Sequence, residues 1–314
     1  MSLSVVIPVF NGEASLEELL AELVRALEPR GPFEVLFVDD CSRDGSWALI
    51  ERLAARDPRV RGIHLMRNYG QHNALLCGVR AARHEVIVTL DDDLQHPPAE
   101  IPRLLDELAR GCDVVYGTPE HLRGHGLLRG LASRVTKLAL QGAMGAEVAR
   151  RVSAFRAFRT RLREAFAGYG SPFVNLDVLL TWGTTRFSSV PVRHDERRRG
   201  VSNYTLRKLI THALNMATGF STVPLQVSSL VGFAFTLFGL GILAYVLVRW
   251  ILEGSVVPGF PFLASAIAIF SGAQLFALGV IGEYLARMHF RSMGKPTYVV
   301  RDVLDAAARK EPGP

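Results

Sequence analysis

The first 120 residues alternate between short apolar runs and stretches of helical periodicity, and no other feature constrains the fold as strongly. The run LSVVIPVF precedes a segment with leucines at helical spacing, and FEVLFVDD, VRGIHLM and EVIVTLDDD are each followed by a further helical pattern. DVVYGT is a fifth strand-like run. Strands that alternate with helices of this length predict right-handed crossovers and an α/β fold with a mostly parallel sheet.

Polar side chains stand where three of these strands should end. Asp39 and Asp40 end the second run, Arg67 and Asn68 follow the third, and Asp91–Asp93 end the fourth. In an open parallel sheet, ligands bind beyond the carboxyl ends of the strands. We therefore expect all three groups to face one edge of the sheet, and this convergence predicts a functional site there.

The acidic cluster suggests a metal ion. In an extended segment Asp91 and Asp93 would point the same way, while Asp92 would turn aside. Two carboxylates without a nearby histidine or thiolate suit a hard cation, Mg²⁺ or Mn²⁺, which would also bind the phosphates of a substrate. The expected ligand is a diphosphate. The alternative is an acidic turn that caps a helix beginning near Pro97.

Two uncharged runs, residues 230–248 and 262–281, are each close to the length needed to cross a membrane. The link between them is short and carries one Arg and one Glu, whereas both outer flanks are rich in Arg and Lys. The positive-inside rule places both flanks in the cytoplasm and the link outside. The segment NYTLRKLITHALNMATGF is expected to lie along the membrane interface, and the N-terminus lacks the basic region of a signal peptide.

Positive charge is concentrated before the membrane segment. Residues 120–208 hold 17 Lys or Arg against 6 Asp or Glu, whereas the net charge of the whole chain is +6. Such a segment can bind anionic lipid or the phosphate of a substrate. Nucleic acid is not an expected partner, because no recognised binding motif accompanies the charge. Three widely spaced cysteines match no metal-ligand pattern and favour a reducing compartment.

Four motifs, in this order and spacing, resemble one enzyme family: VVIPVFNGEASL, VDDCSRDGS, RNYGQHNALLCG and TLDDDLQHPPAEIPRLL. They are similar to those of inverting glycosyltransferases that act on polyprenyl phosphates. This family includes dolichol-phosphate mannose synthases and, most similar here, undecaprenyl-phosphate 4-deoxy-4-formamido-L-arabinose transferases. RHDERRRGVSNYTLRKLI resembles the basic juxtamembrane motif of the family, and GAQLFALGVIGEYLARMHF its final membrane span. The resemblance covers nearly the whole chain.

The resemblance implies a GT-A fold, in which a Rossmann-like domain binds a nucleotide sugar, followed by an interfacial helix and two transmembrane helices. The expected division is a catalytic domain at 1–203, the interfacial helix at 204–224, a membrane hairpin at 225–286 and a cytoplasmic tail at 287–314. The implied reaction transfers a sugar with inversion from a UDP- or GDP-sugar to undecaprenyl or another polyprenyl phosphate. This activity would serve cell-envelope glycan synthesis or lipid A (lipopolysaccharide) modification at the bacterial inner membrane, with both termini cytoplasmic.

The resemblance also assigns roles on the donor side. Pro8 and Glu13 are expected to line the nucleotide pocket, and Asp39 to contact the base. Arg67 and Asn68 either bind the donor or the metal-site structure, or are ordinary loop residues. The residues expected to surround the Mg²⁺ or Mn²⁺ ion and the donor diphosphate, and so to carry catalysis, are Asp91, Asp93 and Gln95. His96 is expected to be a solvated turn residue.

On the acceptor side, the resemblance implies that Arg129 and Arg197 hold phosphate charge. The chain departs from the family at Cys41, where relatives have Gly, and at Asn203, where they have a phosphate-binding Lys. Arg150 or Arg151 stands where relatives have an acidic residue. We expect one of these two arginines to contact the acceptor phosphate.

These departures keep a second hypothesis open, in which the chain is a catalytically impaired membrane scaffold with a glycosyltransferase fold. A processive synthase of the cellulose or hyaluronan type is disfavoured, because it needs a longer membrane region and a Gln-x-x-Arg-Trp motif. The identity of the sugar and the formation of a homo-oligomer stay open.

Overall fold

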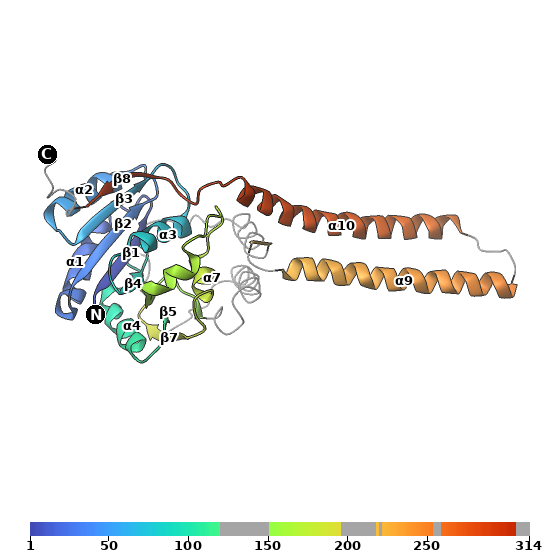
Figure 1. Cartoon of the computed structure of the whole chain (residues 1–314), viewed down its shortest axis with the longest axis horizontal. Coiled ribbons are helices and arrows are strands. Elements are labelled where there is room, and N and C mark those ends of the chain that lie inside the picture. Colours follow the sequence, from blue (N-terminus) through green and yellow to red (C-terminus); the bar gives the residue numbers. More distant parts are fainter. Residues whose placement is uncertain (120–150, 196–217, 220–221, 254–258, 306–314) are drawn as a thin grey trace.

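The computed structural model describes residues 1–119, 151–195, 218–219, 222–253 and 259–305, and every structural statement below concerns these residues. Within them the chain forms an α/β domain and a long hairpin of two helices that projects from it (Figure 1).

Eight strands in this part of the chain form one sheet, in the order β7-β5-β6-β4-β1-β2-β3-β8. β1, β2, β3 and β4 are mutually parallel where they pair, as are β5 and β7, whereas β6 and β8 run antiparallel to their neighbours. The mostly parallel sheet expected from the sequence is therefore confirmed. The strands are β1 Leu3–Val9, β2 Phe33–Asp39, β3 Val60–Leu65, β4 Val86–Thr89, β5 Val114–Pro119, β6 Arg156–Arg159, β7 Phe187–Val192 and β8 Val300–Leu304.

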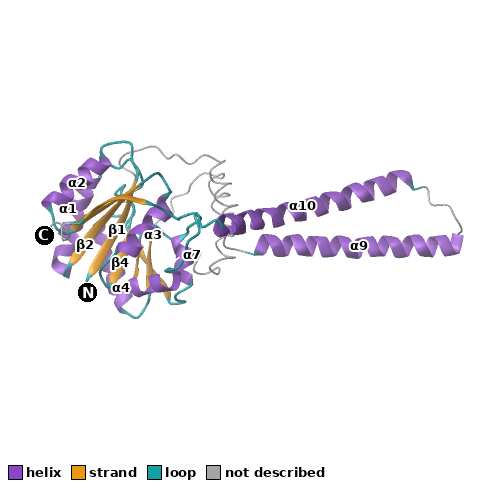
Figure 2. Ribbon diagram, turned by 45° about the horizontal axis from the view of Figure 1, so that its top comes forward, coloured by secondary structure: helices purple, strands orange, loops and turns teal. Residues whose placement is uncertain are grey.

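Helices cover both faces of the sheet (Figure 2). One apolar cluster joins α1, α2 and α4 to one face, and a second joins α3 and α7 to the other. The central strands read as continuous apolar runs because both of their faces are buried. The helices are α1 Leu16–Leu27, α2 Ser46–Arg56, α3 Gln71–Ala81, α4 Ile101–Ala109 and α7 Leu176–Thr181, with 3-10 helices at Glu28–Arg30, Pro98–Glu100 and Thr160–Phe166.

Two long helices, α9 (Val223–Glu253) and α10 (Phe260–Ser292), form the projecting hairpin. Both are long and apolar enough to cross a membrane, and their apolar side chains are largely exposed rather than buried in the protein. Phe235 and Phe270 pack edge to face between them at a centroid distance of 5.9 Å. An apolar surface of this extent fits a lipid environment.

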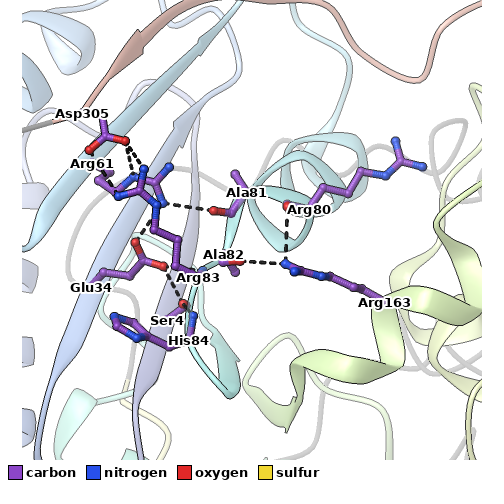
Figure 3. Close-up of polar contacts among 10 residues, drawn as sticks. All are labelled: Ser4, Glu34, Arg61, Arg80, Ala81, Ala82, Arg83, His84, Arg163 and Asp305. Carbon is purple, nitrogen blue, oxygen red and sulfur yellow. Dashed lines mark hydrogen bonds and ion pairs between the residues drawn. The ribbon is translucent and has the colours of Figure 1, made fainter. Parts of the chain in front are cut away.

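After the hairpin, the chain returns to the sheet. β8 pairs antiparallel with β3, so residues 300–304, which lie in the tail expected from the sequence over 287–314, form an edge strand of the sheet. Asp305 then contacts Arg83 and lies 3.5 Å from Nε of Arg61 (Figure 3). Arg61 also donates to Glu34 at 2.8 Å. These contacts, here called the C-terminal clasp, fix the end of the membrane hairpin to the α/β domain.

Candidate functional site

The loops after β1 and β2 interlock at the carboxyl edge of the sheet. The backbone N–H of Asn11 donates to Ser42 Oγ at 2.9 Å, and Asn11 Oδ1 accepts from the N–H of Arg43 at 2.8 Å. Glu13 Oε2 accepts from the N–H of Gly45 at 2.9 Å. Its carboxylate is therefore part of the wall between the two loops and is exposed to solvent.

Pro8 lies buried in β1 opposite Val38 of β2. The other neighbour, β4, pairs with β1 only as far as Val6 and so ends before Pro8. Because proline has no N–H to donate, it is tolerated at a point where a neighbouring strand has stopped. Pro8 thus lies where the sheet opens towards the site.

Asp39 is the last residue of β2 and is fully buried. Its Oδ2 atom lies 2.7 Å from Nδ1 of His64 on β3 and accepts from the N–H of Ser42 at 3.2 Å. Its Oδ1 atom has no hydrogen-bond partner among the described residues. A buried carboxylate oxygen of this kind is costly to leave unsatisfied, which fits a ligand that donates a hydrogen bond here.

Asp40 holds the loop after β3. Its two carboxylate oxygens accept from the N–H groups of Tyr69 and Gly70, each at 2.7 Å. Burial raises the pKa of Asp40 to about 6, against the opposing effect of these two hydrogen bonds. This carboxylate therefore shapes the loop that carries Arg67 and Asn68.

The acidic residues form a turn and not the extended segment expected from the sequence. β4 ends at Thr89, and Leu94 adopts a left-handed conformation at φ 58°. Asp93 Oδ1 accepts from the N–H of Gln95 at 3.1 Å, which stabilises the turn. Asp91 Oδ1 accepts from Nε2 of Gln71, at the start of α3, at 2.6 Å.

Asp92 is directed inwards. Its carboxylate occupies the space beside Gly12 that a side chain at that position would fill. Its Oδ2 atom is buried without a hydrogen-bond partner among the described residues. Burial, together with the charges of Asp91 and Asp93, raises the pKa of Asp92 to about 7. The turn therefore brings three carboxyl groups close enough for their charges to act on one another.

These groups fit a hard divalent cation. The donors available at the turn are carboxylate and amide oxygens, the ligands that Mg²⁺ and Mn²⁺ prefer. In the part of the chain that the structure describes, no three His, Cys, Asp or Glu side chains are grouped as a complete metal site. Mg²⁺ typically takes only one or two protein carboxylates and completes its shell with water and substrate phosphates.

A buried ion pair supports the turn from behind. Arg156 of β6, which lies opposite Thr89, is fully buried and contacts Asp177. Its Nε donates to Thr89 Oγ1 at 2.9 Å, and Tyr116 Oη donates to Asp177 at 3.1 Å. Removing one member would leave the other charge buried without compensation, so the network fixes the end of β4.

His96 is not the solvated residue expected from the sequence. It is 9% exposed, and its ring lies 5.3 Å from that of Phe155 and 4.8 Å from that of His194. Burial, and then the proximity of His194, lowers the pKa of His96 to about 4. The backbone N–H of Asp195 donates to the carbonyl of Gln95 at 2.9 Å, so the chain that leads to the basic juxtamembrane segment begins against the acidic turn.

The structure divides the residues assigned from the sequence into three sets. Pro8, Glu13 and Asp39 lie at the ends of β1 and β2, beside the turn that holds Asp91, Asp93 and Gln95. Arg67 and Asn68 line a separate cavity next to the end of α10. Arg151 is half-buried, and the positions outside the described residues are Arg129, Arg150, Arg197 and Asn203.

Sequence reasoning missed Gln71, His64 and Asp177. Gln71 is the first residue of α3, the helix that follows Arg67 and Asn68. In a parallel sheet this helix begins at the same edge where β4 ends, so the contact of Gln71 with Asp91 could have been predicted from the sequence. The pairing of His64 with Asp39 depends on the register of β2 and β3. Asp177 comes from a short helix that no periodicity in the sequence marked.

Comparison with known proteins identifies relatives of the chain. Residues 4–167 match the family described as Glycosyl transferase family 2. The chain is 37% identical to the undecaprenyl-phosphate 4-deoxy-4-formamido-L-arabinose transferase of Shewanella sediminis, over 98% of this chain and 94% of that protein. It is equally 37% identical to the transferase of the same name from Pseudomonas paraeruginosa, over 97% and 91%.

A solved structure with the same fold is glucosyl-3-phosphoglycerate synthase from Mycobacterium tuberculosis in complex with Mn²⁺, uridine diphosphate and phosphoglyceric acid. Its TM-score is 0.50 at 21% identity, and the match covers 69% of this chain and 76% of that one.

Proposed function

Because the chain belongs to glycosyl transferase family 2, we propose that it transfers a sugar, with inversion, from a nucleotide sugar to undecaprenyl phosphate at a membrane surface. The observation that carries this proposal is that Asp39 and the acidic turn lie at the same edge of the sheet. Asp39 has a buried carboxylate oxygen without a hydrogen-bond partner among the described residues. The curated relatives, which match almost the whole chain, are named for undecaprenyl phosphate as acceptor.

The donor would bind across the ends of β1, β2 and β4. Asp39 Oδ1 can accept a hydrogen bond from the base, and the loops that contain Pro8 and Glu13 would border the nucleoside. The residues that would hold a Mg²⁺ or Mn²⁺ ion are Asp91, Asp93 and Gln95. Such an ion, when bound, would stabilise the negative charge of the departing diphosphate.

The acceptor supplies its own nucleophile. An oxygen of the lipid phosphate attacks the anomeric carbon, a new C–O bond forms, and the bond to the diphosphate breaks with release of the nucleoside diphosphate. A phosphate monoester has a second pKa of about 6, so most of it is already ionised at pH 7 and needs no side-chain base. The arginine in place of an acidic residue at Arg150 or Arg151 is therefore compatible with activity, and that arginine would contact the acceptor phosphate.

The membrane hairpin brings enzyme and lipid together. α9 begins and α10 ends on the side of the α/β domain, and basic residues flank both helices there. By the positive-inside rule this side is cytoplasmic, which places the catalytic domain and both termini at the cytoplasmic leaflet of the bacterial inner membrane. Arg129 and Arg197 would bind phosphate charge there. A cysteine replacing Gly259, between the helices, should react with an impermeant thiol reagent in intact cells, whereas one replacing exposed Met293 should not.

The experiment that tests the function is an incubation of purified full-length protein with undecaprenyl phosphate and a panel of nucleotide sugars. UDP-4-deoxy-4-formamido-L-arabinose is the first donor to test, because the relatives are named for that sugar. We expect a glycosylated lipid phosphate, detected by mass spectrometry, with one donor of the panel. If no donor is consumed in the presence of Mn²⁺ or Mg²⁺, the chain is instead a scaffold that has kept the fold.

A further inference from the structure

A cavity of about 230 Å³ lies where the catalytic domain meets the base of α10. One wall is the loop after β3, a second is the loop at Pro172 and Phe173, and the third is the end of α10 with the chain that leads into β8. The residues that line it are Arg67, Asn68, Tyr69, Asn73, Pro172, Phe173, Phe290, Lys295, Pro296 and Thr297.

Hydrogen bonds fix these walls to one another. The N–H of Met66, next to Arg67, donates to the carbonyl of Val299 at 2.9 Å, so the loop after β3 and the chain after α10 lie side by side. Asn73 Nδ2 donates to the carbonyls of Tyr69 at 2.6 Å and Pro172 at 3.3 Å. The C-terminal clasp secures β8 beyond them (Figure 3). The cavity is therefore built into the fold and does not result from a loose contact between domain and hairpin.

Among the described residues that line the cavity, two are cations and none has an acidic side chain. The guanidinium of Arg67 lies over the ring of Tyr69 at 4.5 Å, and the ammonium of Lys295 lies 5.9 Å from the ring centre of Phe290. Neither cation has an ion-pair partner among the described residues. Stacking uses the face of a guanidinium and leaves the N–H groups at its edge able to bind an anion.

The size and lining of the cavity select the ligand. Sites for drug-sized molecules occupy roughly 300–1,000 Å³, so a whole nucleotide sugar is too large for this cavity. A phosphate with the first part of an apolar chain is a better match, because Phe173 and Phe290 supply apolar walls beside the cations. Two cations also match a phosphate monoester, which carries a charge of about −1.5 to −2 at pH 7, better than a singly charged phosphodiester.

The cavity is connected to the acidic turn through one short loop. The chain continues from Arg67 to Gly70, whose N–H donates to Asp40, and to Gln71, which donates to Asp91. We propose that Arg67 and Lys295 bind the phosphate of a polyprenyl phosphate acceptor where it leaves the membrane. This inference rests on the proposed function for the identity of the lipid. It assigns Arg67 to the acceptor and not, as the sequence suggested, to the donor.

A binding measurement tests this without requiring turnover. Farnesyl phosphate, a short polyprenyl phosphate, is titrated into full-length protein in detergent, and UDP with Mn²⁺ is titrated separately. Arg67→Ala and Lys295→Ala should each weaken farnesyl phosphate binding about tenfold, as expected for loss of one hydrogen bond to a charged group. Arg67→Lys should recover part of this loss, and UDP affinity should stay unchanged. The matched control is Arg110→Ala, since Arg110 is an exposed arginine directly after α4 that pairs with Glu107.

The alternatives give different results. If Arg67→Ala weakened UDP binding and left farnesyl phosphate binding unchanged, Arg67 would belong to the donor site and the inference would be wrong. If phosphatidylglycerol competed as well as farnesyl phosphate, the cavity would be a general site for anionic headgroups, and the inference would equally fail. If the variants lose farnesyl phosphate binding but the wild-type protein transfers no sugar, the cavity assignment stands and the proposed function fails. If the wild-type protein transfers sugar but both variants bind farnesyl phosphate as tightly as the wild type, the proposed function stands and the cavity assignment fails.

Discussion

The side-chain amide of Gln71 donates a 2.6 Å hydrogen bond to Oδ1 of Asp91 and so joins the start of α3 to the acidic turn after β4. The loop between β3 and α3 donates a hydrogen bond from the N–H of Tyr69 to Asp40, and it forms a wall of the cavity beside α10. One segment of seven residues, 65–71, thus borders both the proposed metal site and the proposed acceptor site.

Replacing Gln71 with Ala should weaken metal binding. Groups that orient a metal ligand typically contribute 10- to 100-fold in metal affinity, and the exposure of Gln71 places it at the lower end. We expect the Mn²⁺ concentration for half-maximal transfer to rise about tenfold, with the rate restored at saturating Mn²⁺. An unchanged Mn²⁺ requirement would show that Asp91 does not depend on this hydrogen bond.

Cys41 occupies a left-handed conformation at φ 60°, at a position where the family resemblance implies glycine. The strain of this conformation costs about 1–2 kcal/mol for a residue with a Cβ atom, and glycine loses about 0.5–1 kcal/mol more backbone entropy on folding. Cys41→Gly should therefore stabilise the protein by up to about 1 kcal/mol in denaturant unfolding. Cys41→Val should destabilise it, and Cys41→Ser is the control expected to be neutral. A glycine variant less stable than the wild type would contradict this.

Asp40 should make stability depend on pH between about 4 and 6. Burial raises its pKa from 3.8 to about 6, so the folded protein holds this proton over a range in which the unfolded chain has lost it. Because the folded state binds more protons there, the contribution of Asp40 to stability falls as pH rises through this window. Asp40→Asn keeps one acceptor oxygen and does not titrate. As the pH rises from 4 to 6, its free energy of unfolding should increase relative to that of the wild type by on the order of 3 kcal/mol. Parallel profiles of unfolding midpoint against pH would refute the expectation.

The C-terminal strand should contribute measurably to the stability of the catalytic domain. Truncation after Tyr298 removes β8 and Asp305, exposes the edge of β3, and takes one partner from Arg61 and Arg83. We expect the thermal midpoint to fall by roughly 5–10 °C. Truncation after Asp305 keeps the strand and the clasp, so it serves as the control and should leave the midpoint unchanged. Equal midpoints for both truncations would mean that β8 adds no stability.

Much of the fold was predictable from the sequence because local pattern and topology agree. Leu16, Leu19, Leu20, Leu23 and Leu27 are all buried, as their spacing indicated. The parallel order of the central strands brings the ends of β2, β3 and β4 to one edge, as the alternation of strands and helices predicted.

The remaining features depend on contacts between distant segments. β8 lies more than 230 residues after its partner β3, and its short exposed sequence carries no strong strand signal. The burial of His96 follows from packing against Phe155 and His194, which no local pattern reveals. The turn at Asp91–Asp93 depends on Leu94 adopting a left-handed conformation, a state that sequence reasoning does not expect for leucine. The cavity beside Arg67 requires the return of the chain after α10.

The central claim is that the acidic turn supports metal-dependent transfer to the lipid phosphate. Its most direct test is the rate of lipid glycosylation by wild-type protein and by Asp93→Asn, measured side by side over a titration of Mn²⁺ after removal of metal with a chelator. Wild-type activity should be lost with the metal and return with Mn²⁺. Asp93→Asn should stay folded, because the residue lies at the edge of the sheet, and should remain inactive throughout. Full activity of chelator-treated wild type, or of Asp93→Asn, would contradict the account.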